Sequence, residues 1–373
     1  MKSFLVSQNE AGQRLDKLLS KYMDTAPKSF FYKMLRKKNI TLNGKKAEGS
    51  EKVAEGDEIR LFLSDETIEG FQSEKKNNIN STRVENGTVK PEIPLLKDYE
   101  IVFEGKHLLI ANKPAGELSQ KAKKDDISIN ERIVEYLKVT QKIGLDSFTP
   151  GVCNRLDRNT TGLIIAGKSL AGLQEMAELL KQRTVHKYYL CIVAGKADKS
   201  RHLVGYLKKD ESTNTVSVVS AEVFKKQGLN PKEYDRIETE LIPLVTNGGS
   251  TLMAIQLITG KTHQIRAHLA SIGMPLLGDT KYGAEAGNKN STSVERLTRI
   301  NQALHLRYQL LHAYLLQFPL ASGALSEVSE KIITVEPPVK FAKTAEELFG
   351  KEEYKHAIME FKRSARFRTG GTD

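Results

Sequence analysis

Hydrophobic residues near the start of the chain recur at helical and strand spacings. An i, i+3, i+4, i+7 pattern over residues 15–22 predicts one apolar helix face. A second helix is predicted over residues 30–39 (FFYKMLRKKN), where apolar and basic side chains occupy different sides. After the turn signal Asn43-Gly44, alternating leucine and isoleucine predict a half-buried strand that ends near Leu63. We therefore expect a small α+β domain over residues 1–63.

The pattern changes twice in the rest of the chain. Residues 64–97 are rich in Asn, Ser, Lys and Glu and poor in large apolar side chains, which predicts a flexible linker. Strand-like and helix-like segments then mix over residues 98–335, including a hairpin signal at Asn247-Gly248-Gly249. Residues 336–373 are expected to form a helical, basic C-terminal extension. The fold class that this order predicts is α+β: a mixed, largely antiparallel sheet flanked by helices, with a small α+β domain before it.

Charge and cysteine content narrow the class of protein. The 373 residues carry a net charge of +11, and residues 1–63 hold 13 basic and 8 acidic side chains, which is +5. A basic excess favours a polyanionic partner. The two cysteines, Cys153 and Cys191, are too few for a disulfide framework, which favours the cytoplasm. No apolar run approaches the ~18 residues that span a membrane, so we expect no membrane partner.

Two motifs suggest cofactors but lack the required spacing. Gly260-Lys261-Thr262 matches the end of a phosphate-binding loop, but Ile255 stands where that loop needs a glycine. His263 and His268 are five apart rather than at the spacing of a helical zinc pair. We therefore expect no metal, no nucleotide cofactor and no other cofactor.

The densest polar segment surrounds Asp157. It reads Asn154-Arg155-Leu156-Asp157-Arg158-Asn159-Thr160-Thr161-Gly162. An isolated Arg-x-Asp in a loop is most often a structural ion pair. This segment, however, resembles the signature loop of RluA/RluC-type RNA pseudouridine synthases, which reads His-Arg-Leu-Asp, two variable residues, and Thr-Ser-Gly. The chain departs from that motif at Asn154 and Thr161, where polar side chains replace His and Ser.

Other segments are similar to the same family in the same order. They are Asn112 to Gly116, the strand of residues 187–195, the Gly-Lys-Thr-His-Gln-Ile-Arg element of residues 260–266, residues 273–283, and residues 310–313. Lys261 stands where the family commonly has Arg, and we assign it no role. The resemblance covers residues 98–335. Separately, residues 1–63 resemble the alpha-L RNA-binding domain of the ribosomal small-subunit protein four type.

The resemblance implies a role for particular side chains. Asp157 is expected to be the catalytic carboxylate, which either attacks the ribose or moves a proton from it; both routes stay open. Arg266 would keep that carboxylate ionised, and Tyr189 would stack on the uracil. Arg155 would fill the place of the flipped base, and Leu311 would form an apolar floor for the ring. The N-terminal resemblance implies phosphate contacts for Lys33, Arg36, Lys37 and Lys38.

The expected function is isomerisation of specific uridines to pseudouridine, in large-subunit ribosomal RNA, by a cytoplasmic monomer. Transfer RNA is the alternative substrate. A non-catalytic RNA-binding protein of ribosome assembly is an alternative of another class, which the presence of Asp157, Tyr189 and Arg266 disfavours. A carboxylate glycosidase would need a second acid partnered with Asp157, and none can be placed.

Overall fold

The structure is a computed structural model that describes residues 2–7, 10–72, 93–123, 125–141, 148–283 and 292–365, with backbone alone for 141 and 292–296. Most of the predicted linker and the end of the basic tail, including Arg366 and Arg368, lie outside the described residues. No helix in the described part of the chain is long and apolar enough to cross a membrane.

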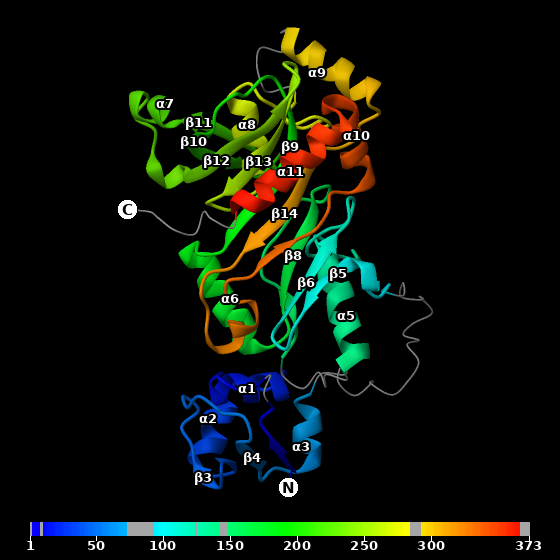
Figure 1. Ribbon diagram of the computed structural model, residues 1–373. Helices are drawn as coiled ribbons and strands as arrows, with labels where there is room; N and C mark the ends of the chain where they lie inside the picture. The colour runs from blue at the N-terminus through cyan, green and yellow to red at the C-terminus, as the bar shows by residue number, and fades with distance from the viewer. Residues whose placement is uncertain are drawn as a thin grey trace.

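The N-terminal residues form a small α+β domain around its own core (Figure 1). An antiparallel sheet of order β1-β4-β2-β3 packs against helices whose apolar faces are those predicted from the spacing of residues 15–22 and 30–39. The elements are β1 (Lys2–Leu5), α1 (Leu15–Tyr22), α2 (Lys28–Arg36), β2 (Ile40–Leu42), β3 (Lys45–Lys46), β4 (Glu58–Leu61) and α3 (Asp65–Gly70).

The small domain extends past the predicted boundary at residue 63. Helix α3 begins after Ser64, whose side chain accepts a hydrogen bond from the amide of Thr67. Ile68 is fully buried in the small core, and Phe71 packs against that core. The first residues of the predicted linker therefore belong to the domain, because tertiary packing stabilises a helix too short to be stable alone.

The large domain is built on an 11-stranded sheet of order β11-β10-β12-β13-β9-β14-β8-β6-β5, with β15 paired to β14 and β7 to β8. Adjacent strands are antiparallel except β14 and β8, which run parallel, so the predicted fold class is confirmed. The strands are β5 (Ile101–Glu104), β6 (Leu108–Lys113), β7 (Gly151–Val152), β8 (Thr161–Gly167), β9 (His186–Ala194), β10 (Arg201–Asp210), β11 (Thr215–Ser220), β12 (Asp235–Thr246), β13 (Ser250–Leu257), β14 (Leu311–Gln317) and β15 (Ile332–Thr334). The helices are α5 (Ile129–Gln141), α6 (Leu170–Gln182), α7 (Ala221–Lys226), α8 (Gln264–Ser271), α9 (Thr292–Ala303), α10 (Val339–Phe349) and α11 (Lys351–Ala365).

The middle of this sheet is buried on both faces. Along β9, Tyr189 and Cys191 face one apolar cluster, whereas Tyr188 and Leu190 face another. This explains why the strand is continuously apolar rather than alternating. The face that Tyr189 shares is the one on which the polar site described below is built.

The C-terminal helices α10 and α11 cover the opposite face of the sheet (Figure 1). Phe341, Tyr354 and Phe361 are buried in the same cluster as Tyr188 of β9. Residues 336–365, part of the predicted helical, basic C-terminal extension, therefore form an integral layer of the large domain. Their apolar residues recur at helical spacing, but that spacing does not reveal which face they cover.

Strands β8 and β14 approach so closely at Gly162 that no side chain fits there. Gly162 has φ +106°, and a Cβ atom would lie 2.2 Å from the carbonyl oxygen of Ala313. Because Gly162→Ala adds both backbone strain and a clash, we expect it to destabilise the domain by about 3 kcal/mol in chemical unfolding.

Gly248→Ala is the matched control for that substitution. Gly248 has φ +80°, but nothing lies within 4 Å of a Cβ atom built there. It should cost about 1 kcal/mol, from backbone strain alone. Equal losses of stability in the two variants would contradict the close strand contact.

Candidate active site

Five residues predicted from four separate segments line one pocket of the large domain. Arg155 and Asp157 come from the loop between β7 and β8, Tyr189 from β9, Arg266 from α8 and Leu311 from the first position of β14. Tyr189 and Leu311 are on neighbouring strands, since β9 pairs with β14. The structure therefore brings together every residue that the family resemblance assigned to the reaction.

Asp157 is bound by Arg266 across 109 positions of sequence. Arg266 Nη1 donates a hydrogen bond of 3.1 Å to Asp157 Oδ2. The other side of the guanidinium binds Asp279 in a bidentate pair, with Nε to Oδ2 at 2.7 Å and Nη2 to Oδ1 at 2.9 Å. Arg266 also lies over the Tyr282 ring, 5.1 Å from its centroid. A guanidinium held at this many points can present a fixed N–H direction to Asp157.

Burial and charge set the protonation of the groups around Asp157. Burial opposes the charge of Arg266, but the hydrogen bonds and charge of Asp279, together with Asp157, raise its pKa above the ordinary value. The guanidinium therefore stays charged. Burial, with a smaller contribution from the Asp157 charge, raises the pKa of Tyr189 well above its ordinary range. Tyr189 is thus a neutral phenol at physiological pH.

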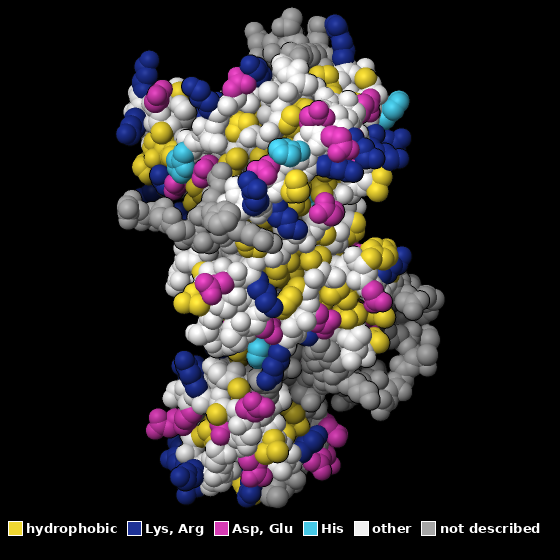
Figure 2. Space-filling model, in the orientation of Figure 1, with side chains coloured by type: hydrophobic (Ala, Val, Ile, Leu, Met, Phe, Trp, Pro, Cys, Tyr) yellow, Lys and Arg dark blue, Asp and Glu magenta, His cyan; other side chains and the backbone are white. Residues whose placement is uncertain are grey.

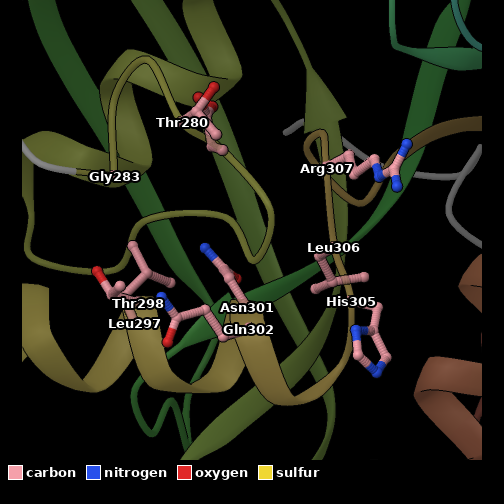
Figure 3. A pocket seen from close by; sticks show the side chains of 10 residues that line it. Thr280, Gly283, Leu297, Thr298, Asn301, Gln302, His305, Leu306 and Arg307 are labelled. Carbon is pink, nitrogen blue, oxygen red and sulfur yellow. The ribbon is translucent and has the colours of Figure 1, made fainter.

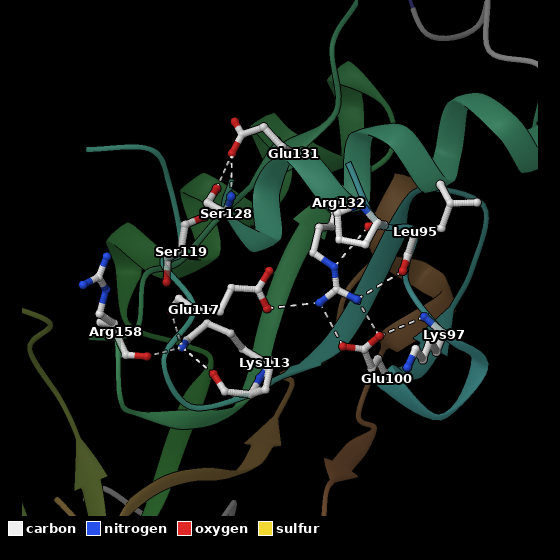
Figure 4. Close-up of polar contacts among 12 residues, drawn as sticks. Leu95, Lys97, Glu100, Lys113, Glu117, Ser119, Ser128, Glu131, Arg132 and Arg158 are labelled. Atoms are coloured by element: carbon white, nitrogen blue, oxygen red, sulfur yellow. Dashed lines mark hydrogen bonds and ion pairs between the residues drawn. The ribbon is translucent and has the colours of Figure 1, made fainter. Parts of the chain in front are cut away.

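The backbone on both sides of Asp157 is held by two buried side chains. The Ser119 hydroxyl donates to the carbonyl of Leu156 at 2.8 Å and accepts from its amide at 2.9 Å. Lys113 is fully buried, and its Nζ donates to the carbonyl oxygens of Arg158 at 2.9 Å, Glu117 at 2.7 Å and Pro114 at 2.9 Å (Figure 4). Burial lowers the pKa of Lys113 to about 8, although the negative charges of Glu117 and Asp157 raise it.

A buried ion-pair chain continues from this loop to the start of the domain. Arg132 pairs with Glu117 at 3.1 Å and with Glu100 at 2.7 Å, and it donates to the carbonyl of Leu95 at 3.1 Å (Figure 4). Leu96 is itself buried in the core of the domain. The large domain therefore includes a few residues before the predicted boundary at 98, because Arg132 satisfies their backbone carbonyls.

The two departures from the signature loop have structural roles. Asn154 Oδ1 accepts a hydrogen bond of 2.8 Å from the amide of Ile165, which fastens the loop to β8. The Thr161 hydroxyl lies 2.8 Å from His312 Nδ1, and His312 Nε2 lies 2.9 Å from the carbonyl of Val335. Since a carbonyl only accepts, we assign the His312 proton to Nε2 and the donor role to Thr161. Lys261, which also departs from the motif, pairs with Asp235 at 2.7 Å at the pocket rim.

Sequence reasoning assigned no role to three residues of this site: Asp279, Tyr282 and His263. Asp279 is only 2% exposed, and an aspartate buried so deeply needs a partner, which the sequence does not reveal. His263 was considered only as a metal ligand, whereas here its Nε2 lies 4.0 Å from Asp157 Oδ1. Asp279 and His263 lie in segments that resemble the family, but the spacing of residues does not reveal which side chains they contact.

The four predicted basic RNA contacts lie in the small domain. Lys33, Arg36, Lys37 and Lys38 are all exposed on or just after α2. Lys33 and Arg36 line a surface hollow of about 590 Å³, which Lys46 of β3 also lines. Figure 2 shows Lys and Arg side chains, in dark blue, at the left and lower edges of this domain. Lys46 was not predicted, because a turn separates it from the basic helix.

Another cavity, of about 510 Å³, is lined by Asp279 and by residues that Figure 3 shows. Side chains of α9 and of the segment that follows it line this cavity, including Asn301, His305 and Arg307. Of the residues predicted for catalysis, none lines it. Asp279 lines this cavity and also pairs with Arg266.

Known proteins are similar to this domain and to much of the chain. A family model described as RNA pseudouridylate synthase matches residues 107–271. The uncharacterized RNA pseudouridine synthase MG370 of Mycoplasma genitalium is 29% identical, over 85% of this chain and 88% of its own length. Ribosomal large subunit pseudouridine synthase C of Vibrio vulnificus is 28% identical, over 74% of this chain and 79% of its own length.

Among solved structures, human RNA pseudouridylate synthase domain containing 4 aligns with a TM-score of 0.49 and 24% identity, covering 66% of this chain and 92% of that one. The segment matched by the family model, residues 107–271, carries Asp157, Tyr189 and Arg266, which all line the pocket. Residues 107–271, which hold most of this pocket, therefore match the RNA pseudouridylate synthase family.

Proposed function

We propose that the chain converts specific uridines of large-subunit ribosomal RNA to pseudouridine, with Asp157 as the catalytic carboxylate. The observation that carries this proposal is the Asp157–Arg266 pair inside the pocket that Tyr189 and Leu311 also line. The ribosomal target is proposed because relatives such as the Vibrio vulnificus protein are named for the ribosomal large subunit.

Asp157 presents one oxygen atom to Arg266 and the other to the pocket. Isomerisation breaks the N1–C1′ bond, turns the uracil and joins its C5 to C1′. Asp157 Oδ1 would either attack C1′ or take a proton from C2′, and both routes need an ionised carboxylate. Arg266 donates a hydrogen bond to Oδ2, and Asp279 holds Arg266 in that direction.

The remaining pocket residues suit a flat, neutral base. The target uridine must leave its stack, which costs a few kcal/mol. Tyr189 offers an aromatic face, and Leu311, 5% exposed, offers an apolar surface for the ring. Arg155 is exposed at the pocket, where its guanidinium can stack in the place of the flipped base.

We propose that the small domain, residues 1–72, holds RNA through the basic surface of α2 and β3. Replacing Lys33, Arg36 and Lys37 by Ala should remove up to three phosphate contacts. The slope of log K against log salt concentration should then fall by about two, since each phosphate contact contributes about 0.7 to 0.9. Filter-binding titrations at several salt concentrations measure this slope.

The matched control replaces three exposed lysines of the C-terminal helices, Lys343, Lys351 and Lys355, by Ala. The net charge changes by the same amount, so a general charge effect would reduce both slopes equally. Equal slopes in the two triple variants would contradict a specific RNA surface on α2.

The substrate is tested by mapping pseudouridines in total RNA from cells with and without the gene. Loss of sites in large-subunit ribosomal RNA is the expected result. Loss of sites in transfer RNA alone would replace the substrate and keep the reaction. An unchanged map would instead favour the non-catalytic alternative. The monomeric state and the cytoplasmic location stay predictions.

A further inference from the structure

His263 lies in the pocket beside the oxygen atom of Asp157 that Arg266 does not bind. Its Nε2 is 4.0 Å from Asp157 Oδ1, too long for a hydrogen bond and short enough for a substrate atom to contact both groups. His263 lines the pocket with a side chain that is 11% exposed. The carboxylate and the imidazole therefore form two adjacent sides of the space that a substrate would enter.

The backbone and a tyrosine fix the direction of this imidazole. His263 precedes α8 with φ +53°, a left-handed conformation that is uncommon for a non-glycine residue and concentrates at functional sites. Its Nδ1 lies 2.9 Å from the Tyr282 hydroxyl, which accepts a hydrogen bond of 3.0 Å from the amide of Val216. The Val216 amide can only donate, so it takes one acceptor position of the phenol, and we assign the phenolic proton to the hydrogen bond with Nδ1.

The remaining proton of the imidazole is then on Nε2, facing the pocket. Burial is the main cause that lowers the pKa of His263, and the positive charges of Arg266 and Lys281 lower it further, against the raising effect of Asp157 and Asp279. The ring is thus neutral at physiological pH, with an N–H donor beside Asp157. A neutral donor leaves the negative charge of Asp157 available for the reaction.

We propose that His263 Nε2–H donates a hydrogen bond to O2 of the target uracil, and that Tyr282 positions it for this role. The inference rests on the proposed function, because it concerns the same site. A carboxylate that acts at C1′, or at C2′ next to it, lies close to O2, since O2 is bonded to the carbon adjacent to N1. When the N1–C1′ bond breaks, its electron pair moves onto the uracil and raises the negative charge on N1 and O2. No proton needs to be transferred, because the hydrogen bond itself stabilises that charge.

The first experiment compares His263→Gln with His263→Met, two side chains of nearly equal length and shape. Gln keeps an N–H donor near the place of Nε2, and Met does not. In single-turnover assays with excess enzyme, Met should reduce the rate about 10²-fold or more, whereas Gln should stay within about tenfold of wild type. RNA affinity and thermal midpoint should match in the two variants. Equal rates for Gln and Met would overturn the proposal.

The second experiment changes the acceptor on the substrate. Sulfur accepts hydrogen bonds more weakly than oxygen, so 2-thiouridine at the target position should slow the wild-type enzyme more than it slows His263→Met. An equal effect of the sulfur substitution in both proteins would show that His263 does not contact O2.

The tautomer is tested without any activity measurement. In ¹⁵N spectra of histidine-labelled protein, the His263 signals, identified by their loss in His263→Gln, should show an unprotonated Nδ1 and a protonated Nε2. Tyr282→Phe, which keeps the ring over Arg266, should shift the population towards the other tautomer. A protonated Nδ1 in the wild type would overturn the inference, even if the protein isomerises uridine. If the wild type shows the expected tautomer but does not isomerise uridine, the proposed function is contradicted and the tautomer assignment is not.

Discussion

Asp157→Asn should abolish isomerisation and leave RNA affinity unchanged. The amide keeps the size of the carboxylate and can still accept a hydrogen bond from Arg266 Nη1, which lies 3.1 Å from Oδ2 in the wild type. It can neither attack the ribose nor take up a proton, so the single-turnover rate should fall by at least about 10⁴-fold. The measurement is pseudouridine formed in a large-subunit ribosomal RNA fragment, alongside the dissociation constant for the same RNA.

Asp198→Asn is the control for that substitution. Asp198 is an exposed residue of the same domain that pairs with Lys196 at 3.0 Å, so its loss changes the net charge equally. Its rate should equal that of the wild type. Product formation by Asp157→Asn at more than a small fraction of the wild-type rate would remove Asp157 from the proposed catalytic role.

Asp279→Ala should cause the largest loss of stability among single substitutions at the site. It leaves Arg266, whose side chain is 9% exposed, without its bidentate partner. Breaking one side of a buried ion pair costs about 3–5 kcal/mol. At about 2–4 °C per kcal/mol for a domain of this size, the thermal midpoint should fall by roughly 6–20 °C. The isomerisation rate should also fall, by about 10²-fold, because Arg266 no longer has a fixed direction towards Asp157.

The matched control for Asp279 is Asp235→Ala, which breaks an exposed ion pair with Lys261. An exposed pair contributes less than about 1 kcal/mol, so calorimetry should find a midpoint within about 4 °C of wild type. If Asp279→Ala unfolded at the same temperature as this control, the buried pair would not support the domain.

The sequence predicted best those elements whose own residues show a helical spacing or a turn motif. The apolar helix faces of the small domain and the hairpin around Asn247 appear in the structure where the spacing placed them. The grouping of Asp157, Tyr189 and Arg266 was predicted as well, but through family resemblance rather than spacing. No local rule brings together residues from a loop, a strand and a helix.

Other features could not be read from the chain because they depend on tertiary contacts. Ile68 and Phe71 lie in a segment that is polar as a whole, and only the small core shows why α3 forms. The helical spacing near Phe341 does not tell which surface it covers. The Asp279–Arg266 and His263–Tyr282 pairs depend on how the turn after α8 folds back beside that helix.

The fully buried ammonium group of Lys113 has a consequence for the energetics of RNA binding. Its three hydrogen bonds to carbonyl oxygens, one of them on Arg158, order the loop as the domain folds. Ordering one residue of backbone costs about 1–2 kcal/mol of conformational entropy. Because this cost falls on folding and not on association, the free energy of RNA binding remains available to unstack the target uridine.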